Sequence, residues 1–330
     1  MHYRRLNQTD LEVSRVAFGC MSTVGSQTYD GVAEAEAVAT IHAAMDLGIN
    51  FFDTARAYAE GESERILGKA IRGRRDDVII ASKPMGPTLA RDELLAECDQ
   101  SLTDLGVDCI DLYQIHWPRH QVALEETADA MLRMVEAGKI RHIGVCNFGT
   151  GDLGEWKEFA PVTTNQIAYN LLYRAAELEL LPMLEELGGG VLCYSPLAQG
   201  LLAGRYATAD EVPSGRARTR HFAGSRPEAR HGEDGCESVT FEAIGRLQAI
   251  AERSGHSMAD LSLAWLLAQP LVVSVLAGAS RPDQVKRNAA VVDLSLDDGL
   301  IGELTSATDA VRSALGPSLD MWASPPRMRS

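Results

Sequence analysis

Long apolar runs and closely spaced cysteines are missing from this sequence of 330 residues. Its longest apolar runs have the length of strands, whereas a membrane-spanning helix needs about 20 apolar residues, and none has the pattern of a signal peptide. We therefore expect a cytoplasmic protein with no membrane partner. The six cysteines lie far apart and form no C-x-x-C pair, which argues against a disulfide framework and against a cysteine-rich zinc site. We expect reduced thiols and no bound metal.

Positive charge is also scarce. The chain has 31 lysines and arginines against 46 aspartates and glutamates, a formal net charge of -15. This balance favours solubility and repels phosphate backbones, so nucleic acid is not an expected partner. Any anionic ligand would have to be held by a local cluster of basic side chains.

Strand and helix patterns alternate along the chain between residues 15 and 291. The predicted strands cover residues 15–19, 49–53, 78–82, 109–115, 140–145, 164–168, 191–194 and 271–276. The predicted helices cover residues 34–47, 64–72, 91–105, 124–137, 152–159, 177–187, 241–253, 258–267 and 282–291. Eight strand-helix units without a linker predict an α/β protein with one (β/α)8 barrel domain over residues 1–330.

Two further elements flank the predicted barrel. Residues 3–6 and 11–13 are expected to form an N-terminal β-hairpin, and residues 297–314 an extra C-terminal helix. A doubly wound sheet is the alternative architecture. It is disfavoured because no predicted strand is followed by the G-x-G-x-x-G fingerprint of that fold.

Three successive predicted strands end on a residue able to do chemistry: Asp53, Lys83 and His116. The carboxyl ends of barrel strands face one common mouth, so we expect these side chains to meet there, with Tyr58 from the following loop. An ammonium beside a phenol stabilises the phenolate, and Asp53 would supply the counter-charge for Lys83. The pattern predicts Tyr58 as a proton donor, with His116 bound to the substrate oxygen or relaying a proton.

Each of these residues also has a structural interpretation. Asp53 and Lys83 would be an ion pair of the barrel rim, and His116 a satisfied core histidine. Their joint position on successive strand ends favours the catalytic interpretation. His116 and His120 have the spacing of zinc ligands on one helix face, but Pro118 disfavours a helix there, so we expect no metal site.

Two later segments are candidates for binding a ligand. The loop after Tyr194 starts with a glycine-rich stretch, suited to close approach of a ligand, and continues with arginines at positions 216, 218, 220, 226 and 230. A loop this long is typical of a functional lid, although its distal arginines would also suit a solvated loop. Near the end of the last strand, residues 278–282 open a helix whose N-terminus favours an anion, and Arg281 suits phosphate. We therefore expect a phosphate-bearing cofactor.

The motifs, taken in order, resemble those of the aldo-keto reductase family over nearly the whole chain. They are residues 50–55 (NFFDTA) followed by Tyr58, 61–68 (GESERILG), Ser82 with Lys83, 114–118 (QIHWP), 138–148 (GKIRHIGVCNF), 194–202 (YSPLAQGLL) and 278–282 (GASRP). The resemblance implies a barrel that binds an extended NADP(H) at its mouth without a Rossmann motif. It also implies a catalytic tetrad of Asp53, Tyr58, Lys83 and His116.

The activity that this resemblance implies is reduction of an aldehyde or ketone by NADPH, or the reverse oxidation of an alcohol or sugar. Tyr58 would act as the general acid. The alternative is a slow-turnover regulatory or redox-sensing subunit that binds NADP(H), because some proteins with this barrel bind membrane channels. The expected partner is a small-molecule carbonyl or alcohol.

The resemblance also assigns cofactor contacts. Asn147 and Gln166 would hold the nicotinamide amide, with the ring stacked on Tyr194. The other implied contacts are Gly19, Cys20, Met21, Asp53, Cys146, Ser195, Pro196, Leu197, Gly200, Leu202, Arg205, Gly278, Ser280, Arg281, Gln284, Arg287 and Asn288. Of these, residues 195–205 would clasp the pyrophosphate, and residues 278–288 would bind the 2'-phosphate and adenine.

Two positions depart from the family pattern. Cys146 stands where many relatives have serine, which weakens one amide contact. Arg287 stands where relatives of this subgroup often have a glutamate facing adenine, and we interpret the added cation as favouring NADPH over NADH. The substrate itself has no motif, because loops build its pocket; the expected pocket residues are Met21, Tyr29, Trp117, Phe148 and Trp322.

Overall fold

The computed structural model describes residues 1–26 and 31–330. Eight parallel strands form a closed barrel, in which each strand pairs with the next along the chain and the last pairs with the first. They are β3 (Val16–Gly19), β4 (Phe51–Asp53), β5 (Ile79–Ser82), β6 (Ile110–Ile115), β7 (Ile140–Cys146), β8 (Thr164–Ala168), β9 (Gly190–Tyr194) and β10 (Val272–Ala277). The predicted (β/α)8 barrel is therefore confirmed.

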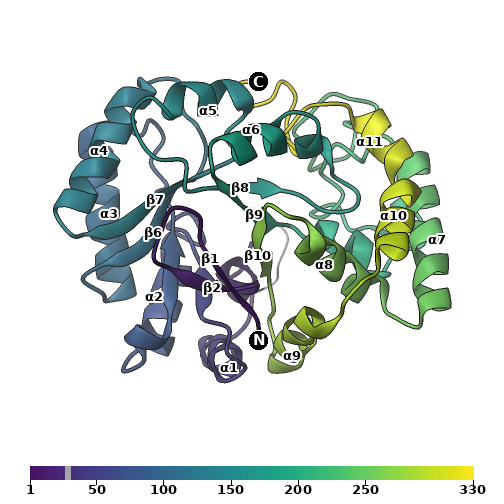
Figure 1. Ribbon diagram of the computed structural model, residues 1–330, viewed down its shortest axis with the longest axis horizontal. Coiled ribbons are helices and arrows are strands. Elements are labelled where there is room, and N and C mark those ends of the chain that lie inside the picture. The colour runs from purple at the N-terminus through teal and green to yellow at the C-terminus, as the bar shows by residue number, and fades with distance from the viewer. Residues whose placement is uncertain (27–30) are drawn as a thin grey trace.

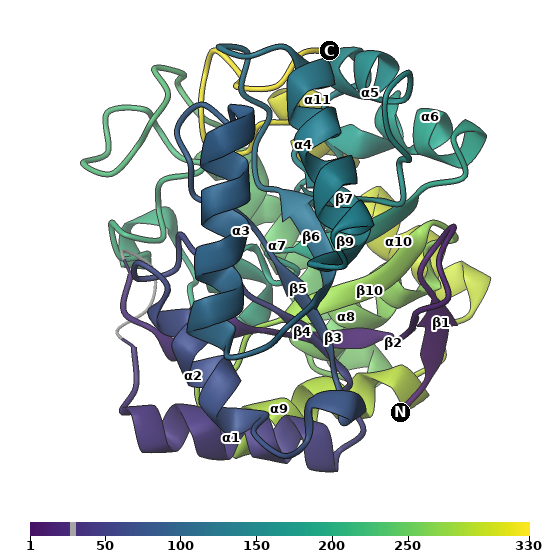
Figure 2. The ribbon, with the colours of Figure 1, turned by 90° about the vertical axis from the view of Figure 1, so that its left-hand side faces the viewer.

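Helices surround this barrel on all sides (Figure 1, Figure 2). They are α1 (Glu34–Asp46), α2 (Glu62–Ala70), α3 (Arg91–Leu105), α4 (Leu124–Glu136), α5 (Thr150–Trp156), α6 (Leu180–Glu186), α7 (Glu237–Ser254), α8 (Met258–Ala268) and α9 (Pro282–Ala290). Buried residues at helical spacing give each its inner face; in α4 these include Thr127, Met131 and Met134.

Several expected helices differ from the prediction in their bounds, and two of these differences have a specific structural cause. The helix expected over residues 177–187 starts at Leu180, because Pro182 has no amide proton and is tolerated only in the first turn. The helix expected over 297–314 is broken into α10 (Asp298–Ala307) and α11 (Asp309–Leu315). Arg174 donates to the Thr305 carbonyl at 2.7 Å and to Thr308 Oγ1 at 3.1 Å, so it occupies the acceptor that a continuous helix would use.

The predicted N-terminal hairpin is present as β1 (Tyr3–Arg5) and β2 (Glu12–Ser14). It lies across the barrel centre in Figure 1. Leu6, Leu11 and Val13 are buried against the apolar residues inside the barrel. The hairpin therefore closes the amino end of the barrel and leaves the carboxyl ends of the strands to form a site.

The inner face of the barrel changes from apolar to polar along the strands. Residues two positions apart point to the same side of a strand, so Phe51 and Asp53 share the inner face of β4, as Leu112 and Gln114 do on β6. Phe51 and Leu112 belong to the interior apolar cluster, whereas Gln114 and Gln166 both donate to Asp53. The apolar residues inside the barrel thus lie below a layer of polar side chains at the mouth.

Within the described residues, no helix combines the length and the apolar character needed to cross a membrane.

Candidate active site

A buried lysine lies at the centre of the barrel mouth. Lys83, directly after β5, is fully buried, and its Nζ donates to Asp53 Oδ1 at 2.6 Å and to the Thr54 carbonyl at 2.8 Å. The same Nζ lies 3.5 Å from the hydroxyl of Tyr58 and 5.2 Å from the centroid of its ring. Three of the four predicted residues therefore meet within hydrogen-bonding distance.

Asp53 is held by donors from three strands or strand ends. Besides Lys83, Gln166 Nε2 donates to Oδ2 at 2.7 Å and Gln114 Nε2 at 3.3 Å. A buried carboxylate with an ammonium partner and two amide donors has its charge well compensated. The carboxylate can thus fix the position of the Lys83 ammonium.

His116, the fourth predicted residue, lies beside Tyr58. The two rings meet edge to face with centroids 6.0 Å apart. Burial, together with the positive charges of Lys83, Arg119 and Arg327, lowers the pKa of His116 to about 3. The imidazole is therefore neutral near neutral pH and can donate one hydrogen bond to an oxygen in the cavity.

The protonation of Tyr58 differs from the expectation. Burial raises the pKa of Tyr58 to about 12, and the opposing charge of Lys83 offsets this only in part. Burial also acts to lower the pKa of Lys83, but Asp53 and Tyr58 outweigh it, and the net shift is upward. The expected activation of the phenol by Lys83 is thus smaller than the cost of burying a phenolate, so Tyr58 is protonated and Lys83 is charged.

A cavity of about 530 Å³ opens above these groups at the carboxyl ends of the strands. Its described lining includes twelve of the residues expected from sequence: Gly19, Met21, Asp53, Tyr58, His116, Trp117, Asn147, Gln166, Tyr194, Ser195, Gly278 and Trp322. Residues from seven strand ends and from the C-terminal tail therefore converge on one space.

Other expected residues lie elsewhere. Cys20, Cys146 and Leu202 are almost completely buried. Phe148, expected in the substrate pocket, is fully buried and packs edge to face on Trp156 with ring centroids 5.6 Å apart, so its side chain belongs to the core behind the site. Tyr29, also expected in the pocket, lies outside the described residues.

Tyr194 contacts both the barrel and the C-terminal tail at the edge of the cavity. Its hydroxyl donates to Asn147 Oδ1 at 2.8 Å and lies 3.4 Å from the indole nitrogen of Trp322. Asn147 Nδ2 donates in turn to the carbonyl of His116 at 3.1 Å. The aromatic face expected to receive a nicotinamide ring is therefore held by the C-terminal tail as well as by the barrel.

The loop after β9 has an unusual backbone. Ser195, Ala198 and Gln199 all have positive φ (50°, 46° and 59°), a conformation that costs energy for residues other than glycine. Gly200 follows with φ of 98°. Such strained backbone persists where the surroundings impose it, and it is concentrated at ligand sites. This loop is the segment expected to clasp the pyrophosphate, together with Pro196, Leu197 and Arg205.

The start of α9 carries the other expected cofactor residues. Arg281 is the N-cap residue, Pro282 occupies the first helical position, and Gln284 Oε1 accepts from the Ser280 amide at 2.8 Å. Arg281 and Arg287 both contact Asp283, at 3.2 and 3.1 Å. Asn288 donates to the Gly278 carbonyl at 3.4 Å. The exposed Arg281 guanidinium therefore lies at the N-terminus of α9, and Arg287 reaches back from the last turn to Asp283 in the first turn.

His120, the other residue of the possible zinc spacing, has a carboxylate partner. Its Nε2 lies 2.9 Å from Asp152 Oδ1. In the described ranges 1–26 and 31–330, no group of three or more His, Cys, Asp or Glu side chains is placed to hold a metal ion.

Several lining residues were not predicted. Gln114, which donates to Asp53 behind the cavity, was not predicted either, although its position two residues before His116 on the inner face of β6 would have indicated it. Arg218 and Arg230 were noted only as part of a basic loop, and Arg327 had no sequence signal. The tail that carries Arg327 reaches the mouth only through tertiary contacts.

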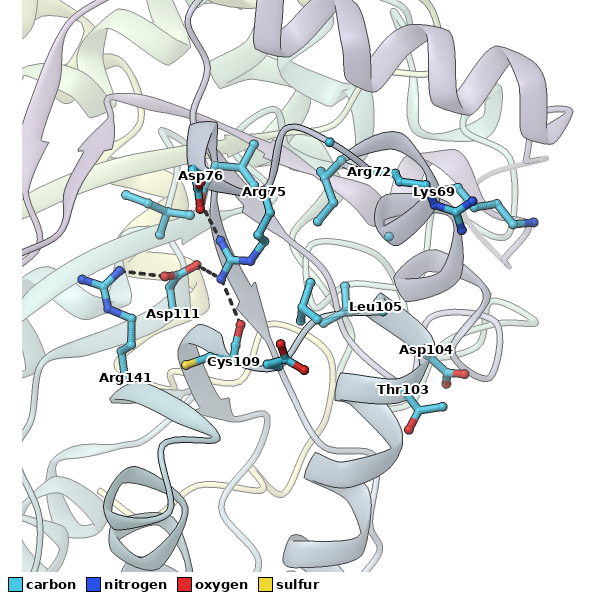
Figure 3. Close-up of a pocket in the computed structure, with 18 of the residues that line it drawn as sticks. Lys69, Arg72, Arg75, Asp76, Thr103, Asp104, Leu105, Cys109, Asp111 and Arg141 are labelled. Atoms are coloured by element: carbon cyan, nitrogen blue, oxygen red, sulfur yellow. Dashed lines mark hydrogen bonds and ion pairs between the residues drawn. The ribbon is translucent and has the colours of Figure 1, made fainter.

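A second and larger hollow, of about 850 Å³, lies at the opposite end of the barrel. Figure 3 shows Arg75 and Arg141 converging on Asp111, whose carboxylate they bind at 2.7 and 2.8 Å. Asp111 also accepts from the Ile80 amide at 2.9 Å. We assign this hollow a structural role despite its size, because its central charges bind one another at the amino ends of the strands.

A model of the Aldo/keto reductase family matches residues 15–309. The chain belongs to this family. Among its relatives is an aldo-keto reductase of Bacillus subtilis, 34% identical over 90% of each chain. Another is the NADH-specific methylglyoxal reductase of Escherichia coli, 31% identical over 92% of this chain and 98% of the relative. This aldo/keto reductase is also 30% identical to a probable voltage-gated potassium channel subunit beta of rice, Oryza sativa, over 89% of this chain and 92% of the relative.

Solved structures of family members have the same fold. The glycerol dehydrogenase of Gluconobacter oxydans covers 96% of each chain with a TM-score of 0.79 at 31% identity. An aldo/keto reductase of Klebsiella pneumoniae, determined with NADP and acetate, covers 89% of this chain and 91% of its own with a TM-score of 0.70 at 29% identity.

Proposed function

We propose that this aldo/keto reductase family member reduces an aldehyde or ketone with NADPH, with Tyr58 as the general acid. The observation that carries the proposal is the buried Lys83 ammonium, which binds Asp53 at 2.6 Å and lies 3.5 Å from the Tyr58 hydroxyl. NADP-bound structures of similar proteins support the choice of cofactor.

The chemistry follows from the charges at the mouth. Reduction turns a carbonyl oxygen into an alkoxide, so a nearby proton donor and a fixed positive charge stabilise the transition state. Tyr58 supplies the proton, because a phenol with a pKa of about 12 keeps its proton at neutral pH. Lys83 stabilises the phenolate that remains, and the neutral His116 donates a hydrogen bond to the same oxygen.

The residues around the cavity fit an extended dinucleotide. The strained loop at Ser195–Gln199 offers backbone amides for a pyrophosphate, and the N-terminus of α9 with Arg281 offers an anion site for the 2'-phosphate. Asn147 and Gln166 offer amide groups beside Tyr194, where a nicotinamide ring would stack. When bound, NADPH supplies the hydride that reduces the carbonyl carbon.

The preference for NADPH is a separate part of the proposal. Arg281 and Arg287 favour a cofactor with an additional phosphate. An Escherichia coli relative is named as specific for NADH, so family membership alone does not decide between the two cofactors.

The test is loss of NADPH absorbance with a panel of aldehydes, ketoses and aromatic carbonyls, with wild type and Tyr58→Phe compared. The variant lacks only the acidic proton, so its kcat should fall at least about a hundredfold while its affinity for NADPH stays nearly unchanged. A variant that keeps more than about a tenth of the wild-type rate would show that another group donates the proton.

The alternative function is a slow regulatory subunit that senses NADP(H), which the potassium channel relatives favour. The number of turnovers separates the two. An enzyme forms many product molecules per chain, whereas a sensor oxidises about one bound NADPH and then stops.

A further inference from the structure

The C-terminal tail, residues 316–330, brings one guanidinium into the active-site cavity. Arg327 is part of the described cavity lining, and 34% of its side-chain surface is exposed. The guanidinium lies 3.4 Å from the ring centroid of Trp117, which directly follows His116 in the chain and also lines the cavity. Arg327 therefore presents hydrogen-bond donors close to the place where a carbonyl is expected to react.

The tail uses only part of the hydrogen-bonding capacity of this side chain. A guanidinium has five N–H groups on three nitrogen atoms. Arg327 Nε donates to Asp320 Oδ2 at 2.8 Å, and Nη2 donates to Asp320 Oδ1 at 2.9 Å. Nη1 has no hydrogen-bond acceptor among the residues that the structure describes. Its two N–H groups are therefore available to an oxygen atom of a molecule in the cavity.

Asp320 and Trp117 together fix the orientation of the guanidinium. Asp320 is fully buried, and its carboxylate also accepts from the backbone amides of residues 322, 323 and 327, at 3.0, 3.2 and 3.2 Å. A bidentate ion pair and a stacked ring leave a guanidinium little rotational freedom. Binding of a ligand at Nη1 would therefore cost little side-chain entropy.

The charge of Arg327 is compensated within the protein. Burial acts to raise the pKa of Asp320, but the hydrogen bonds and the positive charge of Arg327 outweigh it, and the net shift is downward. Asp320 is therefore ionised at neutral pH. An anion at Nη1 would be attracted by the guanidinium and repelled by this carboxylate, whereas a neutral oxygen acceptor avoids the repulsion. The pair therefore suits a neutral acceptor better than an anion.

A second arginine of the same tail makes similar ion pairs without reaching the cavity. Arg329 Nε donates to the buried Asp152 at 2.8 Å, and its Nη2 donates to Glu155 at 2.6 Å. Arg329 does not belong to the described cavity lining. It fastens the tail to α5, so the two arginines differ in their access to a ligand and not in how they hold the tail.

We propose that Arg327 binds the substrate, and that the substrate has a hydroxyl group that accepts a hydrogen bond from Nη1 while its carbonyl lies at Tyr58 and His116. The proposal rests on the carbonyl reduction proposed above. Arg327 then determines specificity, because it selects hydroxyaldehydes over aldehydes without a second oxygen. A site built to donate to a substrate oxygen disfavours an analogue that lacks it, since the donor then loses water without gaining a partner.

The experiment compares aldehydes that differ in one substituent. With NADPH and the wild-type protein, kcat/KM for 2-hydroxypropanal or 3-hydroxypropanal should exceed that for propanal about tenfold. Succinic semialdehyde carries a carboxylate in place of the hydroxyl and should show no such advantage over butanal. An advantage for neither hydroxyaldehyde, or a larger one for the anion, would overturn the proposal.

Variants of the two tail arginines separate substrate binding from support of the tail. Arg327→Lys keeps a positive charge for Asp320 but lacks the planar fork that carries Nη1. It should lower kcat/KM for the preferred hydroxyaldehyde about tenfold and leave that for propanal nearly unchanged. The intrinsic reactivity of each aldehyde cancels in this comparison, because it is the same for both proteins. Arg327→Met should lose the preference as well.

Arg329→Lys is the matched control. It changes the other arginine that fastens the tail, outside the described cavity lining, so the preference for the hydroxyaldehyde should stay at its wild-type value. Equal losses for the hydroxyaldehyde and propanal in Arg327→Lys would mean that Arg327 only holds the tail, and would overturn its role in binding.

Failure of this proposal and failure of carbonyl reduction give different results. Reduction of every aldehyde without preference for a hydroxyl group would overturn the role of Arg327 and leave carbonyl reduction intact. If no aldehyde is reduced, saturation-transfer NMR of propane-1,2-diol and propan-1-ol with the NADP+ complex still decides. Stronger binding of the diol that is lost in Arg327→Lys would support the proposal, and equal binding would overturn it.

Discussion

Burial sets the protonation states of the residues at the barrel mouth. Tyr58 keeps its proton because the surrounding protein disfavours a phenolate, and His116 stays neutral because burial and three nearby cations disfavour a second proton. Lys83 keeps its charge mainly because Asp53 lies 2.6 Å away. The mouth therefore combines a neutral acid, a neutral hydrogen-bond donor and one fixed positive charge, which suits the stabilisation of a developing alkoxide.

The ion pair of Lys83 and Asp53 allows activity and stability to be separated. Lys83→Met should reduce kcat at least about a hundredfold and also cost about 3–5 kcal/mol of stability, because it leaves a buried carboxylate without its partner. The double variant Lys83→Met, Asp53→Asn should regain most of the stability and none of the activity. Activity assays and urea unfolding of both variants measure the two effects. Activity restored in the double variant would mean that Lys83 serves only the fold.

At the scale of elements, helix α9 combines two features that favour an anion. Its N-terminus carries partial positive charge, and Arg281 at the N-cap, three residues after Gly278 of the cavity lining, adds a full charge. Asp283 in the first turn compensates part of this charge, since it contacts both Arg281 and Arg287. The affinity of this helix N-terminus for a phosphate therefore depends on the free energy needed to break the contact between Arg281 and Asp283.

Replacing Arg281 tests this view. A 2'-phosphate occurs only in NADP, so Arg281→Ala should weaken NADPH binding about ten- to a hundredfold and leave NADH binding almost unchanged. Asp283→Asn should instead strengthen NADPH binding, because it removes the carboxylate that competes with the phosphate for the Arg281 guanidinium. Titrations of both cofactors, followed by quenching of intrinsic fluorescence, give the constants. Equal losses of affinity for NADPH and NADH would mean that Arg281 supports the fold or binds the pyrophosphate, which both cofactors contain.

At the scale of the whole molecule, stability depends on polar groups buried behind the active site. Glu64 of α2 is fully buried; its Oε1 accepts from Ser82 at 2.5 Å, and its Oε2 has no hydrogen-bond partner. Ser82 precedes Lys83 at the end of β5. Burial raises the pKa of Glu64 to about 7. This acid therefore holds its proton more strongly in the folded chain than in the unfolded one.

The consequence is a loss of stability as the pH rises from about 4.5 to about 7. A group whose pKa rises on folding contributes stability that is complete below its unfolded pKa and disappears as the pH rises through its folded value, here between about 4.5 and about 7. Glu64→Gln removes this titration. At about pH 8.5 its free energy of unfolding should therefore exceed that of wild type by up to about 3 kcal/mol, and at about pH 5 the two should be similar. Urea unfolding of both proteins at the two pH values measures the difference between their free energies of unfolding. If this difference is the same at both pH values, it comes from packing and not from titration of Glu64.

The sequence by itself determined the barrel and the position of the chemistry on it. Strand and helix periods are local properties, and the alternation of eight units leaves few architectures to choose from. Asp53 and the residues that end β5 and β6 were assigned to one mouth because parallel strands of a barrel share their direction. The N-terminal hairpin and most helix bounds followed from equally local patterns.

Only the tertiary structure decided what surrounds that chemistry. Burial by distant segments sets the pKa of Tyr58 above its ordinary value, where the sequence had suggested activation by Lys83. Arg174 breaks the last helix from more than 130 residues away, and the C-terminal tail brings Arg327, which no motif had indicated, into the cavity lining. Desolvation and long-range pairing depend on which segments meet in space, and the spacing of residues along one strand or helix contains no information about them.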